Sequence, residues 1–252
     1  MDRARYSFLA HAGLELWHPG DVGALHDMLR RVSLSRGARV LDVGAGRAAV
    51  SLHLARTYGA RCVAVERSDH AHALAAREIE ASGQAERITL LHGDFGTFPL
   101  AERSFALAIC LGASHAIGDY EKALKRIGEL VTRPGHVLMG ELYWRKPPSD
   151  EYLAFLGMKL EDLQTHAGNI EIARTLGFET VATREASSTE LDAYEDRYAA
   201  NIEAHVAQHP DDPDAGAMLE TIHAWRRAYL QWGRGTLGFA VYLFQLAAAL
   251  VR

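Results

Sequence analysis

The 252-residue sequence has few cysteines and no excess of positive charge, and both shortages exclude classes of function. Its two cysteines, Cys62 and Cys110, lie in apolar segments, and neither has the C-x-x-C or Cys/His spacing of a metal site. We therefore expect no bound metal, and the thiols suit a reduced cytoplasm. With 27 basic and 32 acidic residues, the formal net charge of −5 gives no electrostatic basis for binding nucleic acid.

Long hydrophobic runs are also missing from the sequence. The first residues, MDRARYSFLAHAGLELWHPGD, lack the continuous apolar stretch of a secretory signal, and Glu15 interrupts them. The longest apolar run, residues 239–251, is about a dozen residues long, whereas a membrane-spanning helix needs about 20. We expect no export signal, no membrane partner and a cytoplasmic location, and we expect residues 239–251 to form a buried strand with an apolar tail.

The segments that are present alternate between apolar, β-branched runs and runs with helical periodicity, which is typical of βαβ units around a parallel sheet. Strands are expected at residues 39–43, 61–66, 88–91, 105–111, 136–142 and 180–184, and in GTLGFAVYLFQL near the end. Helices are expected at residues 48–57, 71–81, 120–131 and 169–176, and over most of 190–232. The predicted fold class is α/β: a Rossmann-like open sheet of seven strands, mostly parallel with the last strand antiparallel, with helices on both faces and a helical cap.

We expect one domain spanning residues 1–252. Within it, an N-terminal helical segment, residues 1–35, and a helical insertion, residues 188–234, are predicted to cover the active site, because an open crevice would bind a small substrate poorly. The alternative for the insertion is a packing helix pair with no role in binding. Neither coiled-coil heptads nor an unpaired apolar helix face indicates an oligomeric state.

The sequence LDVGAGRAAV, residues 41–50, places a glycine-rich turn between the first strand and the helix after it. Such a turn fits a dinucleotide or S-adenosylmethionine, and its glycines do not decide between them. Asp42 decides, because a carboxylate beside the turn would repel a pyrophosphate but attracts the ammonium and sulfonium groups of S-adenosylmethionine. The alternative is a carboxylate that only caps the turn or the helix.

Two later strand ends carry groups that suit adenosine. Glu66 ends the second strand about 20 residues after Gly46, where a carboxylate can accept hydrogen bonds from both ribose hydroxyls of either cofactor. In HGDFG at the end of the third strand, Asp94 can accept from the adenine amine and Phe95 can lie against the ring. An aspartate at such a place is also a common turn former.

In this order and spacing, VLDVGAGR, VAVERS, HGDF and RPGHVLMGE resemble the class I S-adenosylmethionine-dependent methyltransferases over about residues 38–145. The resemblance implies a cofactor site that includes Arg67 beside Glu66, and Leu111 and Gly112 at the end of the fourth strand. The full implied cofactor set is Asp42, Gly44, Ala45, Gly46, Glu66, Arg67, Asp94, Phe95, Leu111 and Gly112. Ala48 departs from the family pattern, because many members have a third glycine there.

The fourth strand ends in CLGASHAIGDY, which lacks the N/D-P-P-Y/F tetrapeptide of many nucleic-acid and protein N-methyltransferases. The sequence instead resembles a small-molecule branch of the class with a helical cap. Ser114 and His115 would then face the transferring methyl, and His115 is the candidate catalytic base because imidazole titrates near neutrality. A turn histidine bonded to the backbone is the alternative.

Aromatic and acidic residues of the N-terminal segment and of the fifth strand are candidates for a substrate pocket, together with Ser114 and His115. Aromatic rings there would exclude water and could stabilise a cation, although such rings are more often part of a core. These candidates are Tyr6, Trp17, Glu141, Tyr143 and Trp144.

The sequence thus predicts an enzyme that transfers a methyl group from S-adenosylmethionine to oxygen or nitrogen of a small molecule, leaving S-adenosylhomocysteine. An NAD-dependent oxidoreductase is a second possibility, but no suitably placed Y-x-x-x-K sequence supports it. A binding protein that keeps the cofactor site without catalysis is the third.

Overall fold

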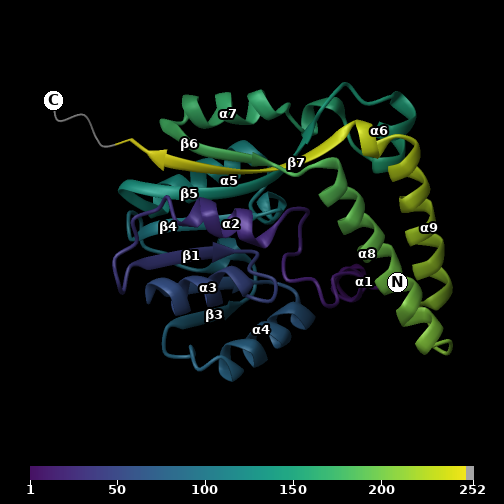
Figure 1. Ribbon diagram of the computed structural model, residues 1–252, viewed down its shortest axis with the longest axis horizontal. Coiled ribbons are helices and arrows are strands. Elements are labelled where there is room, and N and C mark those ends of the chain that lie inside the picture. Colours follow the sequence, from purple (N-terminus) through teal and green to yellow (C-terminus); the bar gives the residue numbers. More distant parts are fainter. Residues whose placement is uncertain (248–252) are drawn as a thin grey trace.

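A seven-stranded sheet forms the centre of the protein in the computed structural model, which describes residues 1–247 (Figure 1). The strands are β1 (Arg39–Val43), β2 (Arg61–Glu66), β3 (Ile88–His92), β4 (Phe105–Leu111), β5 (Val131–Trp144), β6 (Phe178–Glu185) and β7 (Leu237–Leu246). Their order is β3-β2-β1-β4-β5-β7-β6, and β7 runs antiparallel to both neighbours. The predicted fold class is confirmed; residues 248–251 of the expected apolar tail lie outside the described part.

Helices cover both faces of the sheet because each face is built from apolar side chains. Buried residues of α2 (Val22–Leu29), α3 (Ala49–Tyr58) and α4 (Asp69–Ala81) form one cluster with strand residues such as Leu107. On the other face, α5 (Tyr120–Leu130) and α7 (His166–Thr175) contribute to a second cluster that includes Phe105. Burial of both faces explains why the central strands read as continuous apolar runs.

The strand order reverses direction between β1 and β4, which are neighbours in the sheet although β2 and β3 intervene in sequence. In open α/β sheets, ligands bind beyond the carboxyl ends of the strands at such a switch point. The turns that follow Val43 and Leu111 leave the sheet at this place.

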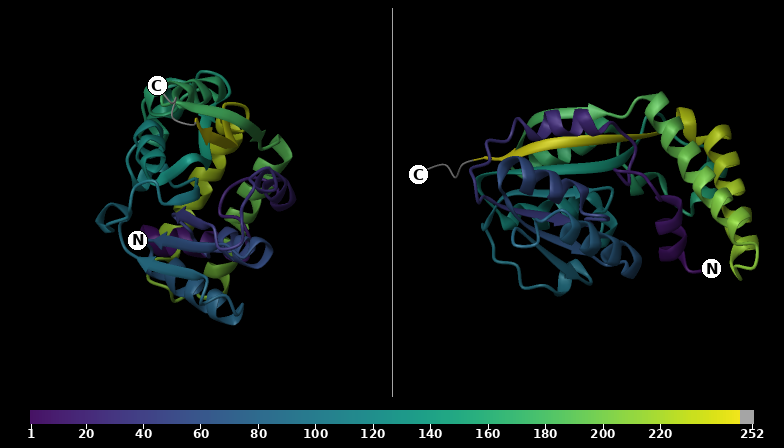
Figure 2. Two further views of the ribbon diagram at one scale, coloured as in Figure 1. Left: turned by 90° about the vertical axis from the view of Figure 1, so that its left-hand side faces the viewer. Right: turned by 60° about the horizontal axis from the view of Figure 1, so that its bottom comes forward.

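A helical layer lies at the carboxyl ends of the parallel strands (Figures 1 and 2). Helix α1 (Arg3–Ala10) packs against α8 (Ser188–Gln208), and α8 packs against α9 (Ala215–Gln231), around a separate apolar cluster. The two views place these three helices at the end of the molecule opposite the end of β7. We call α1, α8 and α9 the helical layer below.

Several boundaries differ from the sequence-based expectations. Strand β5 begins at Val131, five residues before the expected start, because its backbone stays extended through RPG and Val131 already pairs with Phe105. Helix α6 (Asp150–Leu156), in the segment interpreted as a proline-rich exit, was not expected, and the Ser149 hydroxyl caps it by accepting from the Tyr152 amide. Among the described residues, no helix is both long enough and apolar enough to span a membrane.

Candidate functional site

The glycine turn after β1 is fixed by backbone contacts. The amides of Gly44 and Ala45 donate to the Val65 carbonyl at 2.9 and 3.1 Å, which ties the turn to β2. Gly44 has a φ of +68°, and an added Cβ would lie 2.3 Å from the Cβ of Ala113. Only glycine therefore fits there. Ala48, the departure from the family pattern, takes the left-handed conformation with a φ of 61° despite its side chain.

The Asp42 carboxylate is buried beneath this turn. The Ser51 hydroxyl in α3 donates to Asp42 Oδ2 at 2.7 Å, so the carboxylate also anchors α3 to β1. Burial raises the pKa of Asp42 to about 6; the charge of Glu66 acts in the same direction and the Ser51 hydroxyl opposes it. Asp42 nonetheless lines the adjacent cavity, where a cationic group would favour its ionised form.

The carboxylate of Glu66 bridges two backbone segments. Its Oε2 accepts from the Gly46 amide and its Oε1 accepts from the Ser68 amide, both at 2.8 Å. After β3, Asp94 Oδ1 accepts from the Gly96 amide at 2.9 Å, and Phe95 is buried beside it. Both acids therefore help to shape the loops that carry them.

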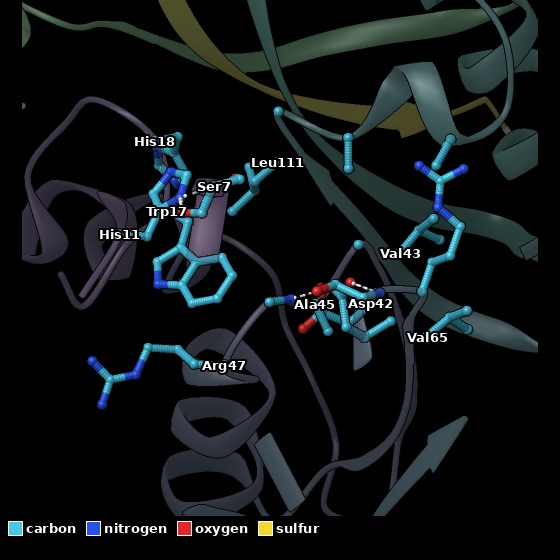
Figure 3. Close-up of a pocket in the computed structure, with 18 of the residues that line it drawn as sticks. Ser7, His11, Trp17, His18, Asp42, Val43, Ala45, Arg47, Val65 and Leu111 are labelled. Atoms are coloured by element: carbon cyan, nitrogen blue, oxygen red, sulfur yellow. Dashed lines mark hydrogen bonds between the residues drawn. The ribbon is translucent and has the colours of Figure 1, made fainter. Parts of the chain in front are cut away.

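These residues surround a first cavity of about 540 Å³ at the carboxyl ends of β1 to β4 (Figure 3). The structure brings all ten predicted cofactor residues to its wall. They are Asp42, Gly44, Ala45, Gly46, Glu66, Arg67, Asp94, Phe95, Leu111 and Gly112.

The N-terminal segment closes one side of the first cavity. Figure 3 shows the Trp17 indole between His11 and the glycine turn; it stacks on His11 with ring centroids 4.9 Å apart. An added Cβ on Gly46 would lie 3.2 Å from Cε3 of this indole. Arg47 Nη1 donates to the Leu14 carbonyl at 2.9 Å, which holds the segment against the turn.

A second cavity of about 910 Å³ extends from the ends of β4 and β5 to the helical layer. Five predicted substrate residues line it, namely Tyr6, Trp17, Ser114, His115 and Glu141. Five residues line both cavities, and we call them the junction: His11, Trp17, His18, Gly112 and His115. His115 lies in the short helix η2 (Ser114–Ala116) and is exposed, and burial of part of its ring lowers its pKa.

His18 was not among the predicted residues, although it is a buried member of the junction. Its Nδ1 lies 2.9 Å from the Pro19 carbonyl and must be the donor, because a carbonyl oxygen only accepts. Burial lowers the pKa of His18 to about 4, so the ring is neutral near pH 7 and Nε2 carries a lone pair. Nε2 has no hydrogen-bond partner within the described chain, and the ring stacks on Phe239 at 5.0 Å.

The geometry can be compared with known proteins. Residues 40–135 match a family described as a methyltransferase domain. The demethylmenaquinone methyltransferase of Corynebacterium efficiens is 34% identical over 106 residues, which are 42% of this chain and 41% of that protein. The family match covers the glycine turn and the strands β1 to β4 around the first cavity. The chain therefore contains a methyltransferase domain over residues 40–135, with the fold of the S-adenosylmethionine-dependent methyltransferases.

Two further proteins resemble nearly all of this methyltransferase. The uncharacterized protein YjhP of Escherichia coli is 26% identical over 215 residues, covering 84% of this chain and 86% of that protein, and its crystal structure superposes with a TM-score of 0.87. A methyltransferase of Thiobacillus denitrificans, crystallised with S-adenosyl-L-homocysteine, has a TM-score of 0.86 and 24% identity, covering 97% of this chain and 99% of that one. These similarities extend the shared fold to the helical layer.

Two predicted substrate residues of the methyltransferase lie elsewhere. Tyr143 is buried and donates its hydroxyl hydrogen bond to Glu185, and Trp144 Nε1 donates to the Leu160 carbonyl at 3.0 Å. Neither lines either cavity in the described structure, because Tyr143 packs against His166 and Trp144 packs against Tyr152. The substrate role expected for both is corrected to one of packing.

The second cavity also contains an acid that sequence reasoning missed. Glu195 in α8 is half-buried, and Trp225 Nε1 in α9 donates to its Oε2 at 2.6 Å. Burial raises the pKa of Glu195 to about 7. Its position in a helix rich in acids gave no sequence signal.

Within residues 1–247, no group of three ligating side chains is arranged to hold a metal ion.

Proposed function

We propose that this methyltransferase transfers the methyl group to a nitrogen or oxygen atom of a small molecule held in the second cavity. The observation that carries the proposal is the junction. There the first cavity, lined by the residues predicted to bind the cofactor, meets the larger second cavity, whose wall includes residues of the helical layer. A volume of about 910 Å³ lies within the range of small-molecule sites.

We assign the first cavity to S-adenosylmethionine. The turn at Gly44 and Gly46 has no room for side chains, so that its backbone can approach a ligand closely, and Asp42 offers a counter-charge to the ammonium of the methionine part. Glu66, with Arg67 beside it, is assigned to the ribose. The remaining assignments are Asp94 and Phe95 to the adenine, and Ala45, Leu111 and Gly112 to the methionine part.

The bound cofactor supplies a methyl carbon that its positive sulfonium has already activated. The protein then contributes alignment and exclusion of water, which the aromatic wall at the junction favours. For a nucleophile that arrives protonated, we assign His115 as the base, because its exposed ring can pass the proton on to solvent. Ser114 lies beside it in the second cavity.

We further propose that residues 1–35 and 188–234 act as a cap within a single domain. Tyr6 and Trp17 of the first segment, and Glu195 of the second, line the second cavity. The buried, unpaired thiols of Cys62 and Cys110 support a cytoplasmic site for the reaction.

Calorimetric titration tests the cofactor assignment. S-adenosylmethionine and S-adenosylhomocysteine are expected to bind with micromolar affinity, and NAD is expected not to bind. Binding of NAD alone would favour the oxidoreductase alternative. Transfer of labelled methyl groups from S-adenosylmethionine to a metabolite extract then separates catalysis from mere binding, since a non-catalytic binding protein would label nothing.

A further inference from the structure

The wall of the second cavity has charge of only one sign. Six carboxylates contribute to it: Asp119, Glu121, Glu141, Glu161, Asp162 and Glu195. Within the described chain, no lysine or arginine lines this cavity. Asp119, Glu121, Glu161 and Asp162 are exposed, and Asp119 is paired with Lys122. The buried Glu141 and the half-buried Glu195 therefore carry most of the preference for a cation over a carboxylate or phosphate ligand, because charges interact most strongly where water is excluded.

Glu141 is the most buried of these acids, with 8% of the residue exposed. Its Oε1 accepts from the Leu142 amide at 3.0 Å, whereas its Oε2 is buried without a partner in hydrogen-bonding geometry. Burial raises the pKa of Glu141, and the nearby Ser114 hydroxyl opposes this shift. A buried carboxylate oxygen without a donor is costly, so a ligand that supplies an N–H group would be bound favourably.

The register of the sheet places Glu141 next to the junction. Leu111 in β4 pairs with Gly140 in β5, and the Gly112 amide donates to the Gly140 carbonyl at 2.9 Å. Glu141 is the next residue along β5 and is therefore level with Gly112, which lines both cavities. His18 Nε2, a second acceptor without a partner, belongs to the same junction.

Electron-rich rings form much of the remaining wall. Five tyrosines line the cavity, and they are Tyr6, Tyr120, Tyr194, Tyr198 and Tyr229. Ring faces attract cationic groups, most effectively where the cation is desolvated. Glu195 lies among these rings on α8, and a cation bound beside it would favour its ionised form and gain a second counter-charge away from β5.

We propose that the methyl acceptor is an amine that enters as an ammonium cation and donates an N–H hydrogen bond to Glu141 Oε2. This inference rests on the proposed function, because it assigns the substrate class of the second cavity. Carboxylates and aromatic rings are a chemically consistent environment for such a cation.

The transfer to an amine balances without another reactant. The ammonium nitrogen first loses a proton to the neutral imidazole of His115, which releases it to solvent. The freed lone pair forms the bond to the methyl carbon while the carbon–sulfur bond breaks and its electron pair stays on sulfur. The methylated nitrogen is again positively charged, and Glu141 remains its counter-charge.

Three probes of similar size but different charge test the proposal: 2-phenylethylamine, 2-phenylethanol and phenylacetate. Calorimetry on the protein saturated with S-adenosylhomocysteine should show the amine binding at least about tenfold more tightly than the other two. A trimethylated analogue keeps the positive charge but has no N–H group for Glu141 Oε2, so it should bind more weakly than the amine, more tightly than phenylacetate, and it should accept no methyl group.

Two substitutions of the wall identify the groups responsible. Glu141→Gln keeps the shape and removes the charge, and it should weaken amine binding about tenfold while the affinity for S-adenosylhomocysteine stays within about twofold. Glu195→Gln should weaken it less, and it provides a second test if Glu141→Gln folds poorly. Glu129→Gln, on the exposed surface of α5, serves as the matched control and should change neither affinity.

The outcomes separate this inference from the function it rests on. If S-adenosylhomocysteine binds but phenylacetate or phenylethanol matches the amine, the acceptor is not selected as a cation and the inference is wrong. Unchanged amine affinity in both Glu141→Gln and Glu195→Gln would also overturn it. If S-adenosylhomocysteine itself does not bind, the proposed function fails first.

Discussion

At the scale of single residues, Gly44 meets two requirements that can be tested separately. Its φ of +68° disfavours any side chain, and an added Cβ would lie 2.3 Å from Ala113 Cβ. We expect Gly44→Ala to lower the free energy of unfolding by more than about 2 kcal/mol, measured by denaturant titration, because strain and overpacking add. Affinity for S-adenosylhomocysteine should fall with it, since the turn must move.

Gly83 provides a matched control, because it has the same φ of +68° with nothing within 4 Å of an added Cβ. Gly83→Ala should show only the conformational strain, about 1 kcal/mol. Combining Gly44→Ala with Ala113→Gly removes the clashing methyl and should recover part of the loss. Equal losses in Gly44→Ala and Gly83→Ala, with no recovery, would mean that contact with Ala113 is unimportant.

The raised pKa of Asp42 predicts that both the folding stability and the affinity for S-adenosylhomocysteine depend on pH. Its folded-state pKa of about 6 is above the value of an unfolded chain, so this group contributes stability below about pH 4 that is lost as the pH rises to about 6. Binding has the opposite sign, because an ammonium group favours ionised Asp42. The affinity for S-adenosylhomocysteine should therefore rise several-fold between about pH 5 and about pH 7, measured by calorimetry.

Two variants assign that pH dependence to Asp42. In Asp42→Asn the affinity should be lower, should vary little over the same range, and should fall more for S-adenosylhomocysteine than for adenosine. Ser51→Ala removes the hydroxyl that donates to Asp42 Oδ2, so the midpoint should move to higher pH. A midpoint that persists in Asp42→Asn would assign the titration to another group.

The sequence correctly placed the site residues that directly follow parallel strands, because the order of the strands determines which strand ends lie side by side. Asp42, Glu66 and Gly112 reach one cavity because parallel strands bring their carboxyl ends to the same edge of the sheet. His18 follows no strand, and its place depends on a loop that folds back over the turn. Tyr143 was misassigned because an aromatic at a strand end does not show whether its ring lines a cavity or packs against another ring.

At the scale of elements, one acidic side chain links the parts of the helical layer. Asp212, in the loop between α8 and α9, accepts from Arg5 of α1 and lies 2.9 Å from His205 Nε2 of α8. The Arg5 and His205 hydrogen bonds hold the pKa of Asp212 well below its usual range. Asp212→Asn should loosen α1 and raise the KM for the acceptor about three- to tenfold, with little change in the affinity for S-adenosylhomocysteine.

An exposed ion pair outside the helical layer provides the control for Asp212→Asn, because its removal shows the effect of losing one negative charge elsewhere on the protein. Glu171 pairs with Arg174 on the exposed surface of α7, so Glu171→Gln should leave both kinetic constants unchanged. Steady-state kinetics with a fixed amine acceptor measures both variants. Equal KM values for Asp212→Asn and the unmodified protein would show that this contact does not hold the cavity wall.

The sequence predicted the helices and strands whose apolar pattern repeats over many residues. It missed the short helix α6, whose formation depends on a capping residue. The helices between the first five strands followed from their apolar spacing, and helix α8 begins at Ser188 because Ser187 and Glu190 form a capping box before it. The short helix α6 depends on one cap at Ser149 and on burial of Tyr152, which no repeating pattern announces. Propensity alone does not fix a helix of two turns.

At the scale of the whole molecule, the shared junction couples the two cavities. Trp17 and His18 line both, and they belong to a segment that Arg47 holds against the glycine turn. A ligand in the first cavity that orders this segment lowers the ordering cost for a ligand in the second, so the two should bind with positive cooperativity. The amine should bind more tightly to the protein saturated with S-adenosylhomocysteine than to the free protein.

Hydrogen exchange can locate this coupling along the chain. S-adenosylhomocysteine alone should slow exchange at the glycine turn, at the ends of β2 to β4 and in residues 14–20, because these segments surround the first cavity. Addition of the amine should extend protection to α8 and α9, whose side chains line only the second cavity. Protection of α8 and α9 by S-adenosylhomocysteine alone, with no further change on adding the amine, would contradict the division of the site into a cofactor cavity and an acceptor cavity.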